Sequence, residues 1–169
     1  MHLMSLLMLL LISFTSSFSY ALSEPEGKVI LTVSGAISAT NTDQGAEFDL
    51  AMLQALPQNS VTTNNPWIRG SHTYQGFSAV DLTKLLKSES QRLQVFALNG
   101  YMTEIPLNDF VEKGAIFAIL QDGQPMEVRQ LGPIMVIYPF DGPEDLKSEV
   151  YYGRSIWQVA EIKLIGLTE

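Results

Sequence analysis

The chain has 169 residues, a formal net charge of −8 and no cysteine. Its length fits one domain of ordinary size, and its hydrophobic share of 46% is typical of a folded chain. The lack of cysteine excludes disulfides, thiolate zinc sites, iron–sulfur clusters and cysteine nucleophiles. The excess of 18 acidic over 10 basic side chains argues against a nucleic-acid partner, which requires a basic surface.

Residues 1–21 have the pattern of a secretory signal peptide. The apolar run from Leu3 to Phe14 is too short to cross a bilayer, which takes about 20 residues. Small residues stand at Ser19 and Ala21, so we expect cleavage after Ala21. The sequence therefore predicts a single exported domain over 22–169, periplasmic or secreted, without a transmembrane anchor after cleavage. An uncleaved anchor or a buried first helix is the alternative.

Short strands and short helices are expected in the first half of the mature chain. Asp49 and Ser78 can each cap a helix, and Pro57 ends the first of them. In chain order we expect a strand over 28–34, a helix over 49–56, a strand over 60–63 and a helix over 79–87.

The second half is dominated by strands. Asn99-Gly100 between two apolar runs predicts a hairpin with a two-residue type I′ turn, and Asp122-Gly123 repeats this signature. The expected elements are strands over 92–98 and 101–107, a one-turn helix over 108–113, a core strand over 115–120, a strand over 133–138, an acidic and aromatic loop over 139–153, and a last strand over 156–164 that carries Trp157.

These elements predict the α+β class. Strands dominate, and they do not alternate with long helices as they do in a doubly wound parallel sheet. We therefore expect several small mixed or antiparallel sheets with short helices.

Polar, cationic and aromatic side chains gather between residues 64 and 74. Amides, a cation and aromatic rings in one loop can line a small-molecule pocket, although a core tryptophan beside an exposed turn is the simpler interpretation. His72 is the only histidine of the mature chain, so a histidine-based metal site or a Ser-His-Asp triad finds too few partners. A histidine in a surface loop is the simpler interpretation. Arg154 can add positive charge for an anion.

Several motifs occur in an order that resembles a known family. They are FDLAMLQALPQ, NNPW, VDLTKLLK, NGYMTEIPL, AIFAILQDGQPM, LGPIMVIYP and SIWQVAEIKL. From Phe48 onward, over about 115 residues, this order is similar to that of the molybdopterin-binding domain of the sulfite-oxidase family. The resemblance implies an α+β domain with several small sheets and, as cofactor, a molybdopterin.

The chain departs from this family at the positions that hold the cofactor. The family binds molybdenum through one cysteine thiolate, where this chain has residues 63–65, threonine and two asparagines. Amide oxygens are poor substitutes for a thiolate on such a metal. Two cations of the family, which would bind the pterin phosphate, fall near Ile134 and at Ile156. The hairpin keeps Gly100 and Tyr101 of the family pattern.

The resemblance and these departures together favour an exported, non-catalytic domain on the molybdopterin-oxidoreductase scaffold. It would bind a small polar or anionic ligand or an envelope protein, with a sensory accessory role as one option. No metal and no cofactor is expected, and molybdopterin is implied by the resemblance alone. The candidate binding residues are Asn64, Asn65, Trp67, Arg69, His72, Tyr101 and Arg154. The alternatives are an active molybdopterin-dependent oxidoreductase that holds its metal without a thiolate, and a structural envelope protein.

Overall fold

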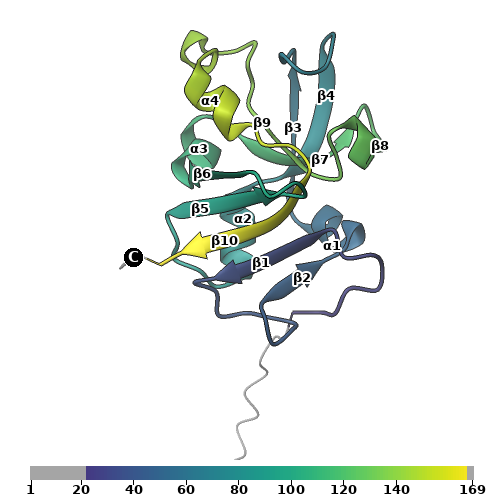
Figure 1. Cartoon of the computed structure of the whole chain (residues 1–169), viewed down its shortest axis with the longest axis vertical. Helices are drawn as coiled ribbons and strands as arrows, with labels where there is room; N and C mark the ends of the chain where they lie inside the picture. The colour runs from purple at the N-terminus through teal and green to yellow at the C-terminus, as the bar shows by residue number, and fades with distance from the viewer. Residues whose placement is uncertain (1–21, 167–169) are drawn as a thin grey trace, which may run out of the picture.

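Two five-stranded sheets form the framework of the computed structural model, which describes residues 22–166 (Figure 1). The predicted signal peptide, 1–21, lies outside the described residues. The first sheet contains, in spatial order, β2 (Ala46–Phe48), β1 (Leu31–Gly35), β10 (Val159–Ile165), β5 (Arg92–Ala97) and β6 (Met102–Pro106). The second contains β3 (Gln58–Thr63), β4 (His72–Phe77), β7 (Ile116–Gln121) and β8 (Gln124–Pro125), with β9 (Met135–Ile137) paired to β7. Among the strands of residues 22–166, only β1 and β10 pair in parallel.

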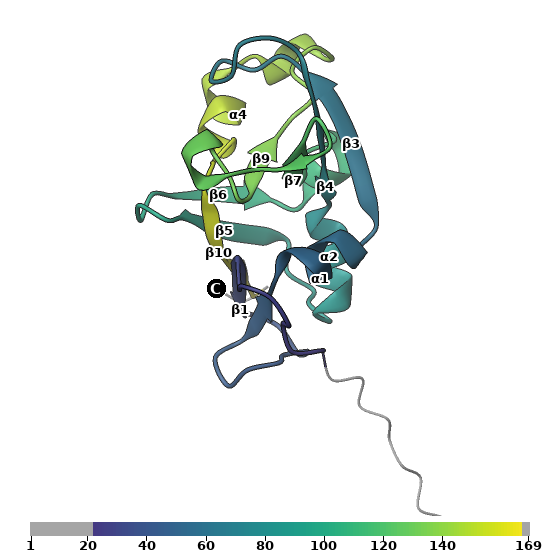
Figure 2. The ribbon, with the colours of Figure 1, turned by 90° about the vertical axis from the view of Figure 1, so that its right-hand side faces the viewer.

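Four short α-helices accompany the sheets within residues 22–166. They are α1 (Leu50–Ala55), α2 (Ala79–Leu85), α3 (Asn108–Glu112) and α4 (Glu149–Arg154). Helix α1 packs against β4 and β7 (Figure 2), whereas α3 and α4 pack against β6 (Figure 1). None of the described helices is long and apolar enough to cross a membrane. The two sheets and the short helices confirm the predicted α+β class, in which strands dominate.

The predicted helix caps are confirmed. The Asp49 carboxylate accepts a hydrogen bond from the Met52 amide at 2.9 Å, and the Ser78 hydroxyl accepts one from the Val80 amide at 3.1 Å. Each satisfies an amide that has no partner inside its own helix. These caps fix where α1 and α2 begin.

The core is centred on β7, as the apolar run over 115–120 predicted. Its first four residues are buried because α1 and the neighbouring strands cover it. Phe117 stacks between Phe77 and Phe110, with ring centroids 5.4 and 5.0 Å away. Such offset pairs add to the stabilisation that comes from apolar burial.

The two predicted hairpins use different turns. Asp122 and Gly123 both have positive φ, +50° and +79°, and so form the type I′ turn between β7 and β8. The type I′ prediction for Asn99-Gly100 is wrong, because of these two residues only Gly100 has positive φ (+82°). The loop between β5 and β6 spans residues 98–101 instead of the predicted 99–100, and the Ala97 carbonyl accepts from the Gly100 amide at 3.0 Å.

The sequence pattern did not predict two of the strands and one of the helices. Strands β2 and β4 were not predicted, because β2 is only three residues long and β4 mixes polar residues with Gly76. Helix α4 lies inside the segment predicted as a loop over 139–153. Its valine, two tyrosines and glycine are weak helix formers, so packing rather than intrinsic propensity stabilises it.

The last strand begins later than predicted. Gln158 has a φ of +53°, which breaks the extended chain, and β10 starts at Val159. Trp157 therefore precedes the strand instead of lying on it. This break leaves the Trp157 side chain beside the loop that contains Trp67.

Candidate functional site

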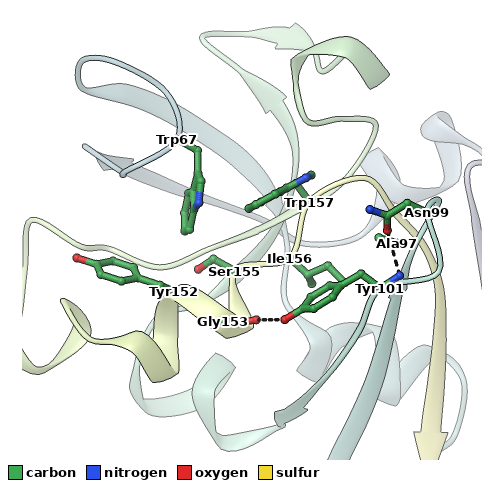
Figure 3. Close-up of a pocket in the computed structure, with 9 residues that line it drawn as sticks. All are labelled: Trp67, Ala97, Asn99, Tyr101, Tyr152, Gly153, Ser155, Ile156 and Trp157. Carbon is green, nitrogen blue, oxygen red and sulfur yellow. Dashed lines mark hydrogen bonds between the residues drawn. The ribbon is translucent and has the colours of Figure 1, made fainter.

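An aromatic pocket of about 400 Å³ opens where α4, the β5–β6 hairpin and the loop after β3 meet (Figure 3). We call this cavity the aromatic pocket. Its lining comes from three separate segments of the chain, and none of the lining side chains carries a charge. The lining residues are Trp67, Ala97, Asn99, Tyr101, Tyr152, Gly153, Ser155, Ile156 and Trp157.

The aromatic rings of the pocket stand at steep angles to one another. Trp67 and Tyr152 are perpendicular, with an interplanar angle of 90° and ring centroids 6.1 Å apart. Trp67 and Trp157 are tilted by 56°, with centroids 5.6 Å apart. Figure 3 shows Trp67 and Trp157 side by side, with Tyr152 and Tyr101 lower in the view. The rings therefore form adjoining walls rather than two parallel plates.

Asn65 holds the backbone of the loop that contains Trp67. Its side-chain oxygen accepts hydrogen bonds from the Trp67 and Ile68 amides at 3.0 and 2.9 Å. Its side-chain nitrogen donates to the Tyr74 hydroxyl at 2.8 Å, and burial raises the pKa of Tyr74 above its usual value. Asn65 is therefore a positioning residue for Trp67 and does not line the aromatic pocket.

Tyr101 reaches the pocket from the β5–β6 hairpin. Its amide donates to the Asn99 side chain at 3.0 Å, and its hydroxyl donates to the Gly153 carbonyl at 3.3 Å. The residue is 51% exposed, so it forms the rim of the pocket rather than its floor. The hairpin thereby contacts α4 across the opening.

Asn64 is one of the three residues, 63–65, that the resemblance sets against the family's thiolate, and its polar groups bond to a carboxylate outside the aromatic pocket. Its amide and its side-chain nitrogen donate to the Asp141 carboxylate at 2.8 and 2.9 Å. These bonds hold the pKa of Asp141 below its usual value. The Thr63 hydroxyl accepts from the Asp141 amide at 3.1 Å, which ties the end of β3 to the loop before α4.

His72 lies on β4, not in a surface loop. Its Nδ1 is 2.6 Å from an Asp122 carboxylate oxygen, and its Nε2 is 3.0 Å from the Arg69 carbonyl oxygen. Both partners are acceptors, so the doubly protonated ring satisfies them together. The Asp122 carboxylate accordingly raises the pKa of His72, and the Arg69 carbonyl adds to the effect.

Arg154 belongs to a buried polar cluster rather than to the pocket. Its guanidinium is 3.0 Å from the Asp109 carboxylate, which also accepts from the Tyr138 hydroxyl at 2.7 Å. Burial, and then the Asp109 contact, raises the pKa of Tyr138 well above its usual range. The guanidinium also lies 5.8 Å from the centroid of the Tyr151 ring. Arg154 is thus committed to a pair inside the protein.

The structure brings together two of the seven predicted site residues, Trp67 and Tyr101. The other five, Asn64, Asn65, Arg69, His72 and Arg154, do not line the aromatic pocket. Sequence reasoning missed Tyr152, Ser155 and Trp157 as lining residues. The only sequence signal for them was the aromatic and glycine content of the segment around α4, which was predicted as a loop.

The residues present do not fit a molybdenum cofactor. The chain has no cysteine, and the described residues contain no group of three histidine, aspartate or glutamate side chains placed to hold a metal. Asn64 and Asn65 donate and accept hydrogen bonds within the protein. No lining side chain is a cation that would bind the phosphate of a pterin.

Comparisons with known proteins give a sequence relative and a structural relative. No protein-family model matches the chain. It is 25% identical over 84 residues to the uncharacterized oxidoreductase YuiH of Bacillus subtilis (strain 168). The aligned residues cover 48% of this chain and 42% of that protein. The fold is similar to that of the sulfane dehydrogenase SoxCD from Paracoccus pantotrophus, with a TM-score of 0.56 and 11% identity.

That structural match covers 80% of this chain and 37% of the SoxCD chain. The chain therefore spans less than half the length of either relative. At 11% identity the SoxCD match shows a similar fold, and at 25% identity over part of each chain the YuiH match shows a sequence relative named as an oxidoreductase.

Proposed function

We propose that this chain is an exported, non-catalytic domain that binds a small molecule in the aromatic pocket. The scaffold would then serve as a receptor for a ligand instead of a holder for a redox centre. The observation that carries the proposal is the pocket itself, about 400 Å³ with four aromatic side chains from three segments. Concave, mostly apolar sites with a few polar groups are the usual form of a small-molecule site.

The polar groups around the pocket favour binding over catalysis. The Ser155 hydroxyl donates to the Tyr151 carbonyl at 2.8 Å, and the Asn99 oxygen accepts from the Tyr101 amide. Neither has a base or an acid as a partner, which a nucleophile or a proton shuttle requires. The pocket therefore offers shape and aromatic surface rather than reactive groups.

An active molybdopterin-dependent oxidoreductase is the alternative, favoured by the oxidoreductase-like scaffold. The donor set argues against it, because neither a thiolate nor a free cation faces the pocket. Metal analysis of protein purified after export separates the two. We expect no stoichiometric molybdenum and no sulfite- or sulfoxide-type redox activity, and molybdenum that survives gel filtration would overturn the non-catalytic proposal.

The ligand proposed for the pocket differs from the ligand that the sequence predicted. A polar or anionic ligand was expected because of Arg69, His72 and Arg154. None of the three lines the pocket, and Arg154 is paired with Asp109. An envelope protein as partner stays a prediction.

Thermal shift with a panel of small molecules tests the proposed function directly. The panel contains amino acids, sugars, nucleobases, carboxylates and quaternary ammonium compounds, because a ligand that binds only the folded state raises Tm. We expect at least one class to raise the Tm of the exported protein, and Tyr101→Leu to weaken that shift. Val150→Ala, exposed on α4 and outside the pocket, is the control. A panel without any shift would contradict small-molecule binding and leave a structural envelope role.

A further inference from the structure

We infer that the aromatic pocket recognises an organic cation, with a quaternary ammonium group as the chemical class that its walls fit. This inference rests on the proposed function and names the ligand class of the same pocket. Three observations carry it: the mutual angles of the rings, the lack of charge among the lining side chains, and the internal hydrogen bonds of the Ser155 hydroxyl and the Asn99 side-chain oxygen.

The angles between the rings suit a compact cation. The face of an aromatic ring carries negative potential, and a cation within about 6 Å of the centroid is attracted to it. Trp67 and Tyr152 are perpendicular, and Trp67 and Trp157 are tilted by 56°. Adjoining walls at such angles present several faces to one rounded group, such as trimethylammonium.

The same angles disfavour a flat ligand. A planar heterocycle between two rings needs faces that are nearly parallel, and neither of these pairs is parallel. Sugars need several hydrogen-bonding groups that are free to turn toward them. The Ser155 hydroxyl and the Asn99 oxygen already bond to backbone groups inside the protein.

Charge also favours a cation over an anion. No lining side chain is basic, and the Arg154 guanidinium beside the pocket is neutralised by Asp109 at 3.0 Å. The whole chain carries a formal net charge of −8, which attracts cations at long range when the salt concentration is low. An anion would therefore enter this pocket without a cationic partner.

The chain contains an internal reporter for this site. It has two tryptophans in all, and both Trp67 and Trp157 line the aromatic pocket. Intrinsic tryptophan fluorescence of the exported protein therefore responds to occupancy of the pocket, and Trp157, which lines the aromatic pocket but not the neighbouring hollow beside Trp67 and Arg129, ties the signal to this site. We propose titrations with choline and with its uncharged carbon isostere, 3,3-dimethylbutan-1-ol, at constant ionic strength. We expect a saturable change with choline at about tenfold lower concentration than with the isostere.

Matched substitutions separate the effect of the aromatic ring on binding from the effect of side-chain volume. Tyr152→Phe keeps the aromatic face and should leave choline affinity nearly unchanged, whereas Tyr152→Leu should weaken it about fivefold. Tyr151→Leu is the control, because Tyr151 is the neighbouring residue and faces Tyr138 and Arg154 instead of the pocket. It should keep the affinity of the original protein, and circular dichroism checks that each variant folds.

The outcomes of this experiment distinguish the two proposals. Equal affinity for choline and the isostere, or equal losses in Tyr152→Phe and Tyr152→Leu, would overturn the cation inference. If a carboxylate, sugar or nucleobase from the thermal-shift panel binds while choline does not, the cation inference fails and the proposed function stands. If none of these compounds changes either Tm or fluorescence, both fail.

Discussion

The two sides of helix α4 use similar residues for opposite purposes. On one side, Tyr151 and Arg154 are three residues apart and share a face of the helix. They pack on Tyr138 and Asp109, and the Asp109 carboxylate accepts hydrogen bonds from the Tyr138 hydroxyl and the Arg154 guanidinium. On the other side, Tyr152, Gly153 and Ser155 line the aromatic pocket. Figure 1 shows α4 at the end of the molecule, above β5 and β6.

The two faces of α4 differ in whether their side chains already have partners inside the protein. The Asp109 side is nearly closed, and its carboxylate is 6% exposed. A closed cluster of this kind contributes to stability because opening it strands a buried charge. The pocket side leaves aromatic faces in contact with solvent, where a ligand can still gain from them. Substitutions on the first side should therefore change folding, and those on the second should change binding.

Arg154→Met should give the largest loss of stability. It removes the partner of the buried Asp109 carboxylate while keeping much of the side-chain volume. We expect the free energy of unfolding to fall by about 2–3 kcal/mol, at the low end of the range for broken buried pairs because the arginine remains 26% exposed. Urea denaturation measures the change. Choline affinity of the folded variant should stay the same, and a loss of binding without loss of stability would reverse the two roles of α4.

Gly100→Val comes next in size and affects the hairpin that carries Tyr101. The φ of Gly100 is +82°, which a β-branched residue adopts only with strain, while no heavy atom lies within 4 Å of an added Cβ. We expect a loss of about 1–2 kcal/mol from backbone strain alone. Gly100→Asn is the matched control, because asparagine tolerates positive φ better. Equal denaturation midpoints for the valine variant and the original protein would argue against this turn.

Tyr101→Leu should separate binding from folding. The side chain is half exposed, so the free energy of unfolding should change by less than about 0.5 kcal/mol. Choline affinity should fall about two- to fivefold, because one aromatic face at the rim is lost. Paired thermal and fluorescence titrations of the same sample check both numbers. Full affinity in this variant would remove the rim from the site.

The smallest expected effect concerns pH and lies outside both faces of α4. The pKa of His72 is raised above 6.5 in the folded protein, chiefly by Asp122. The pair therefore stabilises the fold fully below the unfolded pKa, and this contribution is lost as pH rises through the raised folded pKa. The pKa of Asp122 is lowered, so the same interaction is also lost as pH falls below 3.8 through the folded value.

A comparison of Tm with the His72→Gln variant measures this effect. We expect the original protein to gain Tm over the variant at about pH 5–6 and the difference to shrink toward about pH 9. The gain should be small because the Asp122 side chain is 54% exposed. A difference that does not vary with pH would show that His72 contributes through packing or a neutral hydrogen bond.

Local rules predicted the parts of the fold that depend on neighbours in the sequence. Asp49 and Ser78 mark helix starts, and the apolar run of β7 marks the core, because caps and burial leave direct patterns. Helix α4 was missed because its stability comes from contacts of Tyr151 and Tyr152 with distant residues. Tertiary packing of this kind outweighs weak helix propensity and leaves no periodic signal.

The candidate site was predicted in part, for a related physical reason. Trp67 and Tyr101 were identified from residue type and from the resembled family. Sequence does not show whether a cation is free, and Arg154 is instead paired with Asp109, 45 residues away. It also does not show that Gln158 breaks the chain before β10 and leaves Trp157 facing Trp67.

The two indole N–H signals of the protein test most directly whether the aromatic pocket is the ligand-binding site. Trp67 and Trp157 each supply one such signal, and no other tryptophan is present. In a ¹H–¹⁵N titration with choline, we expect both signals to move along one saturation curve, which shifts to higher concentration in Tyr101→Leu. Indole signals that stay in place while choline is raised to saturating levels would contradict the account.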